Sequence, residues 1–121
     1  MLEQPDELRR WHADPTLTTT AVEELLRYDG PVHLSGRVAV TDVEVNGHPF
    51  RAGDQALTIL AAANRDPARY PDPDRLDIGR DQGPHLTFSY GIHYCLGAAL
   101  ARLEGQVVIN SLVQRLSLIH I

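Results

Sequence analysis

The sequence of 121 residues has one cysteine and few positive charges. Because Cys95 stands alone, it cannot form an internal disulfide. The 11 Lys and Arg residues are outnumbered by 16 Asp and Glu residues, giving a formal net charge of −5. This balance argues against partners such as nucleic acids and anionic membranes. The longest mostly apolar stretch, residues 56–63, is far shorter than the ~20 residues of a membrane span. Residues 1–7 are acidic and lack an apolar signal core, so a cytoplasmic protein is expected.

Helical patterns occupy both ends of the chain. Leu8 and Trp11 are three residues apart, which predicts one buried face on a short helix between Pro5 and about Asp14. Apolar residues recur at helical spacing again after Gly97. They predict a long final helix that ends near Arg115.

A further helix is expected before Gly30, which with the following proline ends it. Thr20 and Glu23 have the spacing of a capping box, so the helix is predicted to begin at Thr20.

The middle of the chain has strand and turn patterns. Alternating valines at residues 38–45 lead into Asn46-Gly47, which predicts two short strands and a hairpin turn. A second turn at residues 52–54 precedes a predicted strand at residues 56–60. Residues 64–87 are rich in proline and charge and show no periodicity, so a long irregular segment is expected there.

Glu24 and Arg27 are three residues apart and therefore lie on one helix face. Judged by spacing alone, such a pair is usually a solvated surface pair worth well under ~1 kcal/mol.

Cys95 directly precedes the final predicted helix. Backbone amides and the helix dipole at that position stabilise a thiolate, which could serve as a metal ligand or a nucleophile. A lone cysteine is nevertheless more often a small buried apolar residue. A zinc site is not indicated, since there is no second cysteine and the histidines lack ligand spacing. His93, two residues before Cys95, leaves a Cys–His nucleophile open.

Taken together, these segments resemble the C-terminal part of a cytochrome P450 of the soluble bacterial type. Residues 88–97 (Phe-Ser-Tyr-Gly-Ile-His-Tyr-Cys-Leu-Gly) match the family's cysteine loop at five ordered positions. Glu24 to Arg27 resembles its Glu-x-x-Arg helix, and residues 73–76 resemble its meander. The fold class implied is mainly α with a small β-sheet, with residues 1–115 forming the C-terminal part of a single domain. Residues 116–121 match one reading frame of a sequencing adapter and are expected to be a non-native tail.

The resemblance implies a role for each matching residue. Cys95 would be the thiolate ligand of the iron in haem b, and Phe88, Gly91 and Gly97 would shape the pocket beneath the haem. His93 and Arg37 would bind the haem propionates. The remaining residues have supporting roles: Glu24, Arg27 and Arg75 as a buried network, and Val32, His33 and Leu34 as a stretch that borders substrate.

Two positions depart from the family pattern. Ser89 stands where the family usually has Gly, and Leu76 stands where the meander usually has Phe. The family's oxygen-activating helix has no counterpart in these residues, and residues 52–54 do not supply it because they lie in a strand–turn–strand context. No catalytic residue is therefore assigned within the chain.

Two interpretations follow. In the first, the chain is part of a monooxygenase that inserts one oxygen atom of O₂ into a small organic substrate. Its electrons would come from a ferredoxin or flavodoxin, with Arg102 as a docking residue or simply a solvated helix charge. In the second, the 121 residues are a non-catalytic remnant that binds haem at most weakly, or a module that packs against other chains.

Overall fold

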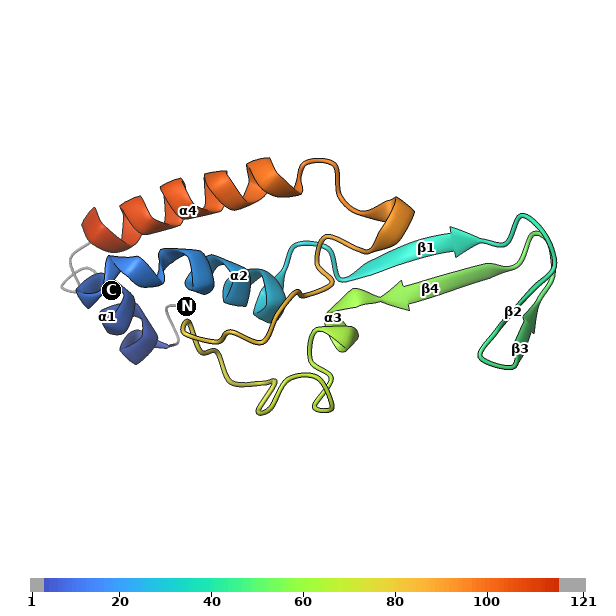
Figure 1. Cartoon of the computed structure of the whole chain (residues 1–121), viewed down its shortest axis with the longest axis horizontal. Coiled ribbons are helices and arrows are strands. Elements are labelled where there is room, and N and C mark those ends of the chain that lie inside the picture. The colour runs from blue at the N-terminus through green and yellow to red at the C-terminus, as the bar shows by residue number, and fades with distance from the viewer. Residues whose placement is uncertain (1–3, 116–121) are drawn as a thin grey trace.

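The computed structural model describes residues 4–115 and divides them into a helical end and an extended β-ribbon (Figure 1). The predicted tail at residues 116–121 lies outside the described residues. The α-helices are α1 (Pro5–Ala13), α2 (Thr18–Asp29), α3 (Leu60–Ala63) and α4 (Ala98–Arg115), with 3₁₀ turns η1 (Pro15–Leu17) and η2 (Gly91–His93). The strands are β1 (Leu34–Val38), β2 (Val43–Val45), β3 (His48–Phe50) and β4 (Gln55–Ile59). The predicted fold class, mainly helical with small sheets, is confirmed.

The hydrophobic core joins α1, α2 and α4. Trp11 is fully buried and packs in one cluster with Leu8, Val22, Ile78 and Val113. The Trp11 indole N–H donates a hydrogen bond to Thr18 Oγ1 over 3.1 Å, so the buried ring keeps its polar atom satisfied. The predicted first and last helices and the buried face of α1 are confirmed.

The start of α2 differs from the prediction. The helix begins at Thr18, and Leu17 occupies the N-cap position without a side-chain cap. Thr20 donates its hydroxyl to the Leu17 carbonyl over 3.0 Å, so the predicted capping box is wrong. The preceding turn η1 supplies the entry geometry in its place, because Asp14 accepts the Thr16 N–H and caps that turn.

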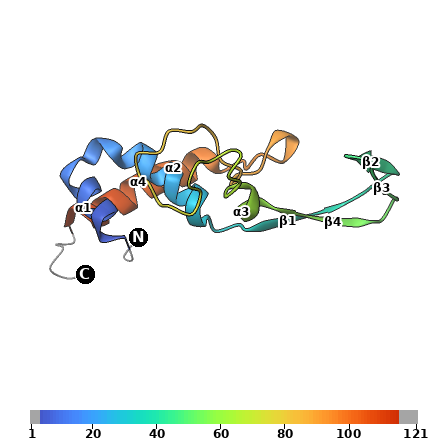
Figure 2. The same cartoon turned by 90° about the horizontal axis from the view of Figure 1, so that it is seen from below.

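The strands form two antiparallel pairs. Strands β1 and β4 pair from Leu34↔Ile59 to Val38↔Gln55, and β2 pairs with β3 around the Asn46-Gly47 turn. Both turn residues have positive φ, as the predicted tight hairpin requires. Seen from below, the ribbon of β1 and β4 extends from α3 to the small β2–β3 hairpin (Figure 2). No helix among residues 4–115 is long and apolar enough to cross a membrane.

The irregular segment after α3 is fixed by a buried ion cluster around Glu24. Arg27 donates to both carboxylate oxygens over 2.7 and 2.9 Å, and the two side chains are only 3% and 1% exposed. Arg27 also donates to the carbonyls of Asn64, Pro73 and Arg75. This burial excludes the interpretation of a solvated surface pair.

The third member of the cluster differs from the expected one. The Arg75 residue is exposed and contributes its carbonyl, whereas Arg80 donates its Nε–H to Glu24 over 3.0 Å. The reason is the turn closed by the Arg75 N–H to the Asp72 carbonyl, which directs the Arg75 carbonyl at both guanidinium groups. The expected role of the Arg75 side chain is therefore wrong, and Arg80 takes it. Leu76, the departure from the family pattern, is buried, and it lies between Arg75 and Asp77, whose backbone groups bond to the cluster.

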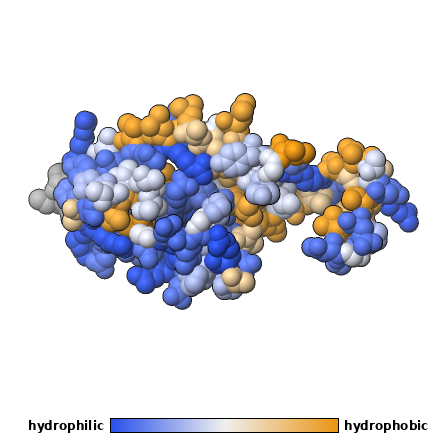
Figure 3. Space-filling model, viewed as in Figure 1, coloured by the Kyte–Doolittle hydropathy of each residue, from blue (hydrophilic) through white to orange (hydrophobic). Residues whose placement is uncertain are grey.

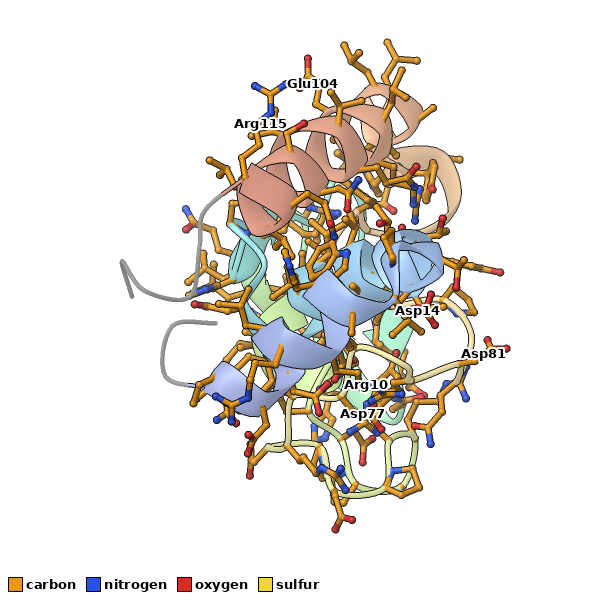
Figure 4. All side chains as sticks on the ribbon, turned by 90° about the vertical axis from the view of Figure 1, so that its left-hand side faces the viewer. Arg10, Asp14, Asp77, Asp81, Glu104 and Arg115 are labelled. Atoms are coloured by element: carbon orange, nitrogen blue, oxygen red, sulfur yellow. The ribbon has the colours of Figure 1, made fainter. Side chains whose placement is uncertain are left out.

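Helix α1 holds the same segment from the other side. Arg10 Nη1 lies 2.9 Å from Asp77 Oδ1, and the two side chains approach each other in Figure 4. The Ile78 N–H donates to Glu7 over 3.1 Å. The irregular segment is thus bound between α1 and α2, which fixes where the following loop begins.

We predict that Glu24→Gln lowers the free energy of unfolding by about 3–5 kcal/mol, because Arg27 and Arg80 stay charged and buried while the carboxylate that pairs with both of them is gone. Urea denaturation followed by circular dichroism measures the change. Glu104→Gln is the matched control, since Glu104 is exposed on α4 and lies well apart from Asp77, whose backbone N–H donates to Glu24 (Figure 4). An equal effect of the two substitutions would contradict the prediction.

Candidate functional site

Residues 88–97, here called the cysteine loop, connect the irregular segment to α4. Phe88 is buried and Cys95 is exposed. The Cys95 N–H donates to the Phe88 carbonyl over 2.9 Å, which closes the loop, and the Cys95 carbonyl accepts the Ala98 N–H at the start of α4. Cys95 is therefore not a small buried apolar residue. Within residues 4–115 no side chain lies within hydrogen-bond reach of its sulfur, which disfavours a Cys–His nucleophile.

Two residues of the loop have left-handed backbone conformations. Ser89 has φ +62° and Gly91 has φ +61°. A Cβ atom at Gly91 would meet nothing within 4 Å, so the glycine is required by backbone conformation and leaves open space in front of the loop. Gly97 lies close to the sulfur, because a Cβ atom there would be 4.0 Å from Cys95 Sγ. The residue next to the sulfur at position 97 thus adds no side chain there, and the thiol itself is exposed.

Two hollows meet beside this loop. One, of about 790 Å³, is lined by loop residues Ser89, Tyr90, Gly91 and Tyr94. The other, of about 430 Å³, adds Arg37 from β1. The two hollows share part of their lining: Ala63, Leu86, Ser89 and Tyr90. Together they offer a largely apolar space whose lining includes two guanidinium groups, those of Arg37 and Arg69, which suits a flat apolar ligand that carries anionic groups.

The remaining predicted site residues are distributed around this space. His93 is exposed in η2. Val32 and His33 line a separate hollow of about 140 Å³ near Arg27, and Leu34 is exposed at the start of β1. The structure thus brings Arg37 to the cysteine loop, while Val32, His33 and Leu34 line neither of the two hollows there.

Arg102 on α4 is engaged by a partner inside the chain. Its Nε and Nη2 donate to the two oxygens of Glu23 over 2.7 and 3.1 Å. Hydrogen bonding to this carboxylate raises the pKa of Arg102. The guanidinium is therefore neither a freely solvated charge nor an unpaired docking residue.

His85 is buried on the other side of Glu23. Its Nδ1 accepts the Thr87 N–H over 3.2 Å, so the neutral ring carries its proton on Nε2. Nε2 lies 3.2 Å from Glu23 Oε2, although the angle is not that of a hydrogen bond. Burial lowers the pKa of His85, and the charges of Arg102 and Arg27 lower it further against the opposing effect of Glu23.

Sequence reasoning did not identify Arg80, His85 or the Glu23–Arg102 pair as parts of the site. Arg80 and His85 lie in the irregular segment, where no periodicity marks the buried positions. Glu23 and Arg102 are 79 residues apart on two different helices. Only the packing of α2 against α4 brings them together.

We predict that Ser89→Gly raises the free energy of unfolding by about 1 kcal/mol, because a left-handed conformation costs a non-glycine residue about 1–2 kcal/mol. Thermal denaturation measures the change. Ser89→Ala keeps the Cβ atom and should show no such gain. An equal gain with alanine would assign the effect to the hydroxyl and contradict the argument.

We also predict that stability falls as the pH drops below about 6.5, the value for an unfolded histidine. Folding lowers the pKa of His85, so between pH 6.5 and the lower pKa of the folded state the unfolded chain binds more protons than the folded chain. The stability that the neutral His85 ring contributes is therefore fully present above pH 6.5 and is lost as the pH falls through this window. The slope of unfolding free energy against pH should be shallower in His85→Gln, and an unchanged slope would contradict the prediction.

Comparison with known proteins places these features in a family. The family model described as Cytochrome P450 matches residues 12–120. The chain is 47% identical to the biotin biosynthesis cytochrome P450 of Bacillus subtilis (strain 168), covering 96% of this chain and 29% of that protein. It is 48% identical to the cytochrome P450 monooxygenase PikC of Streptomyces venezuelae, covering 95% of this chain and 28% of that protein.

Solved structures agree. A crystal structure of P450BioI with a fatty-acid-ligated acyl carrier protein superposes with a TM-score of 0.88 at 47% identity, over 94% of this chain and 30% of that one. CYP109Q5 from Chondromyces apiculatus gives the same TM-score at 45% identity, over 95% of this chain and 30% of that one. The chain spans less than a third of the length of these relatives, all of which are cytochromes P450. The mainly helical chain with its exposed cysteine loop belongs to the cytochrome P450 family.

Proposed function

We propose that residues 1–115 are the C-terminal, haem-ligating part of a cytochrome P450 monooxygenase domain, with Cys95 as the thiolate ligand of the iron. The observation that carries this proposal is the exposure of Cys95, the chain's single cysteine, at the head of α4. It lies in the loop whose residues Ser89 and Tyr90 line an apolar hollow edged by Arg37. Free thiols in proteins are usually buried, whereas a thiolate ligand must face its metal.

The residues of the loop fit a flat macrocycle. Gly97 adds no side chain next to the sulfur, Gly91 leaves open space at the loop, and buried Phe88 anchors the start of the loop. Arg37 and His93 are the candidate partners of the haem propionates, because carboxylates require cationic or N–H donors. When bound, haem b with a thiolate ligand supplies the activation of O₂ for insertion of one oxygen atom into a substrate.

The buried cluster around Glu24 acts at a distance from this chemistry. Arg27 and Arg80 hold the carbonyls of the irregular segment, and that segment leads directly into Phe88. These residues are therefore positioning residues, whose loss should displace the loop.

Substrate and partners are proposed at the level of chemical class. The relatives' names include biotin biosynthesis and vitamin D3 dihydroxylase, which favours a small organic substrate for the whole protein. Val32, His33 and Leu34 are the proposed substrate-bordering residues, and a ferredoxin or flavodoxin is the proposed electron donor. Since Arg102 is paired with Glu23, we do not assign it to docking that donor.

For the 121 residues on their own we propose haem binding without controlled oxygenation. One observation favours this second function: the outer face of α4 is apolar and exposed, with Leu100, Leu103 and Val107 each 58–59% accessible. Figure 3 shows this apolar face along the upper edge of the molecule. The same face would let the chain pack against other chains.

We predict that the chain, reconstituted with haem and reduced under carbon monoxide, gives the Soret band typical of thiolate ligation, because Cys95 is the only thiolate available. The difference spectrum is recorded with a thiol-free reductant. Cys95→Ala and Cys95→Ser should both lose this band. Its persistence in either variant would contradict thiolate ligation by Cys95.

Should the short chain fail to take up haem, a chimera keeps the proposal testable. Residues 4–115 would replace the matching segment of the Bacillus subtilis biotin biosynthesis cytochrome P450, to which they are 47% identical. The chimera should give the thiolate band, and its Cys95→Ala variant should not. A folded chimera that binds haem without the band would overturn the proposed ligation.

A further inference from the structure

The guanidinium of Arg102 contacts both ends of the cysteine loop. Its Nη1 donates a hydrogen bond over 2.9 Å to the hydroxyl of Tyr94, the residue that directly precedes Cys95. Its Cζ lies 4.6 Å from the centre of the Phe88 ring, within the range of a cation–π contact. Tyr94 precedes Cys95 in the chain, and the Phe88 carbonyl accepts the Cys95 N–H. Both residues that Arg102 contacts are therefore bonded to the backbone of Cys95, one covalently and one by a hydrogen bond.

This guanidinium is itself held in one orientation. The two-pronged hydrogen bond to Glu23 fixes the plane of the group against α2, as a point charge such as lysine could not. Glu23 in turn lies against the buried ring of His85. A rigid path of side chains therefore runs from the core of α2 to Tyr94.

The loop has few other attachments. Its own backbone hydrogen bonds are local, from His93 to Tyr90 and from Tyr94 to Gly91. Ile92 and Leu96 are almost fully exposed, at 98% and 103%. For residues 4–115, the bond from Arg102 to Tyr94 is the one side-chain hydrogen bond that links the cysteine loop to the rest of the chain.

We propose that Arg102 is a positioning residue for Cys95, which acts through Tyr94 and is oriented by Glu23. The inference rests on the proposed function of Cys95 as the haem ligand, because only then does the direction of the thiol matter. Arg102 does not touch the sulfur. It restricts the peptide between Tyr94 and Cys95, so the thiol is presented in one direction before any ligand binds.

Amide hydrogen exchange of the 121-residue chain tests this without haem. Tyr94→Phe removes one hydroxyl from a half-exposed ring and should speed exchange of the Cys95 amide by at least about fivefold, because the lost bond involves a charged donor. Tyr90→Phe is the matched control, since it removes a hydroxyl from the same loop and Tyr90 is 81% exposed. The control should exchange like the unmodified chain.

Arg102→Lys and Glu23→Gln provide a second test of the path. Each should speed exchange of the Cys95 amide. Lysine cannot form the two-pronged hydrogen bond to Glu23, and glutamine lacks the negative charge that orients the Arg102 guanidinium. Amides of the core helices, such as that of Val113, report global unfolding in the same experiment. If Tyr94→Phe and Arg102→Lys both leave the Cys95 amide unchanged while the core stays protected, the proposal is overturned.

The haem-loaded chain gives an independent readout. Tyr94→Phe and Arg102→Lys should lower the fraction of reduced carbon monoxide complex that shows the thiolate band. If the unmodified chain gave no thiolate band that depends on Cys95, the proposed haem ligation would be contradicted. The positioning of the Cys95 peptide by Arg102 would still be decided by amide exchange, which does not depend on haem. A full thiolate fraction in both variants would overturn the positioning role even if exchange were faster.

Discussion

The burial of the Glu24 carboxylate is the constraint on which the rest of the structure depends. Its oxygens accept hydrogen bonds from Arg27, from Arg80 and from the Asp77 backbone N–H. Two guanidinium groups and one carboxylate are costly to remove from water, and the cost is offset only when every donor finds an acceptor. Backbone carbonyls of the irregular segment provide those acceptors. The need to satisfy these donors therefore fixes the backbone conformation of the irregular segment, which has neither helix nor strand to hold it.

A second polar group extends this order to the cysteine loop. Glu23 is the neighbour of Glu24 on α2, yet it faces α4 and holds Arg102. One turn of α2 therefore fixes both the segment that enters the loop and the helix that leaves it. The cysteine is exposed, but the segment before it is anchored twice: Thr87 donates to the Leu26 carbonyl of α2, and Tyr94 accepts from Arg102 of α4. This arrangement combines an accessible thiol with a rigid support.

Much of the local structure could be predicted from residue patterns. The spacing of Leu8 and Trp11, the Asn46-Gly47 turn and the apolar period after Gly97 each predict an element that the fold contains, because these signals act over a few residues. The start of α2 could not be predicted in this way. Thr20 and Glu23 have the spacing of a capping box, but the helix begins at Thr18, whose hydroxyl accepts a hydrogen bond from the buried Trp11 ring.

The sequence by itself determined the order of helices, hairpin and loop, and through the ordered motif around Cys95 it also indicated the family. Only the tertiary structure decided which polar residues pair. It selected Arg80 over the side chain of Arg75, and it paired Arg102 with Glu23. The physical reason is that burial of a charge depends on what surrounds it in space. Residues that are distant along the chain become partners only when α1, α2 and α4 pack together.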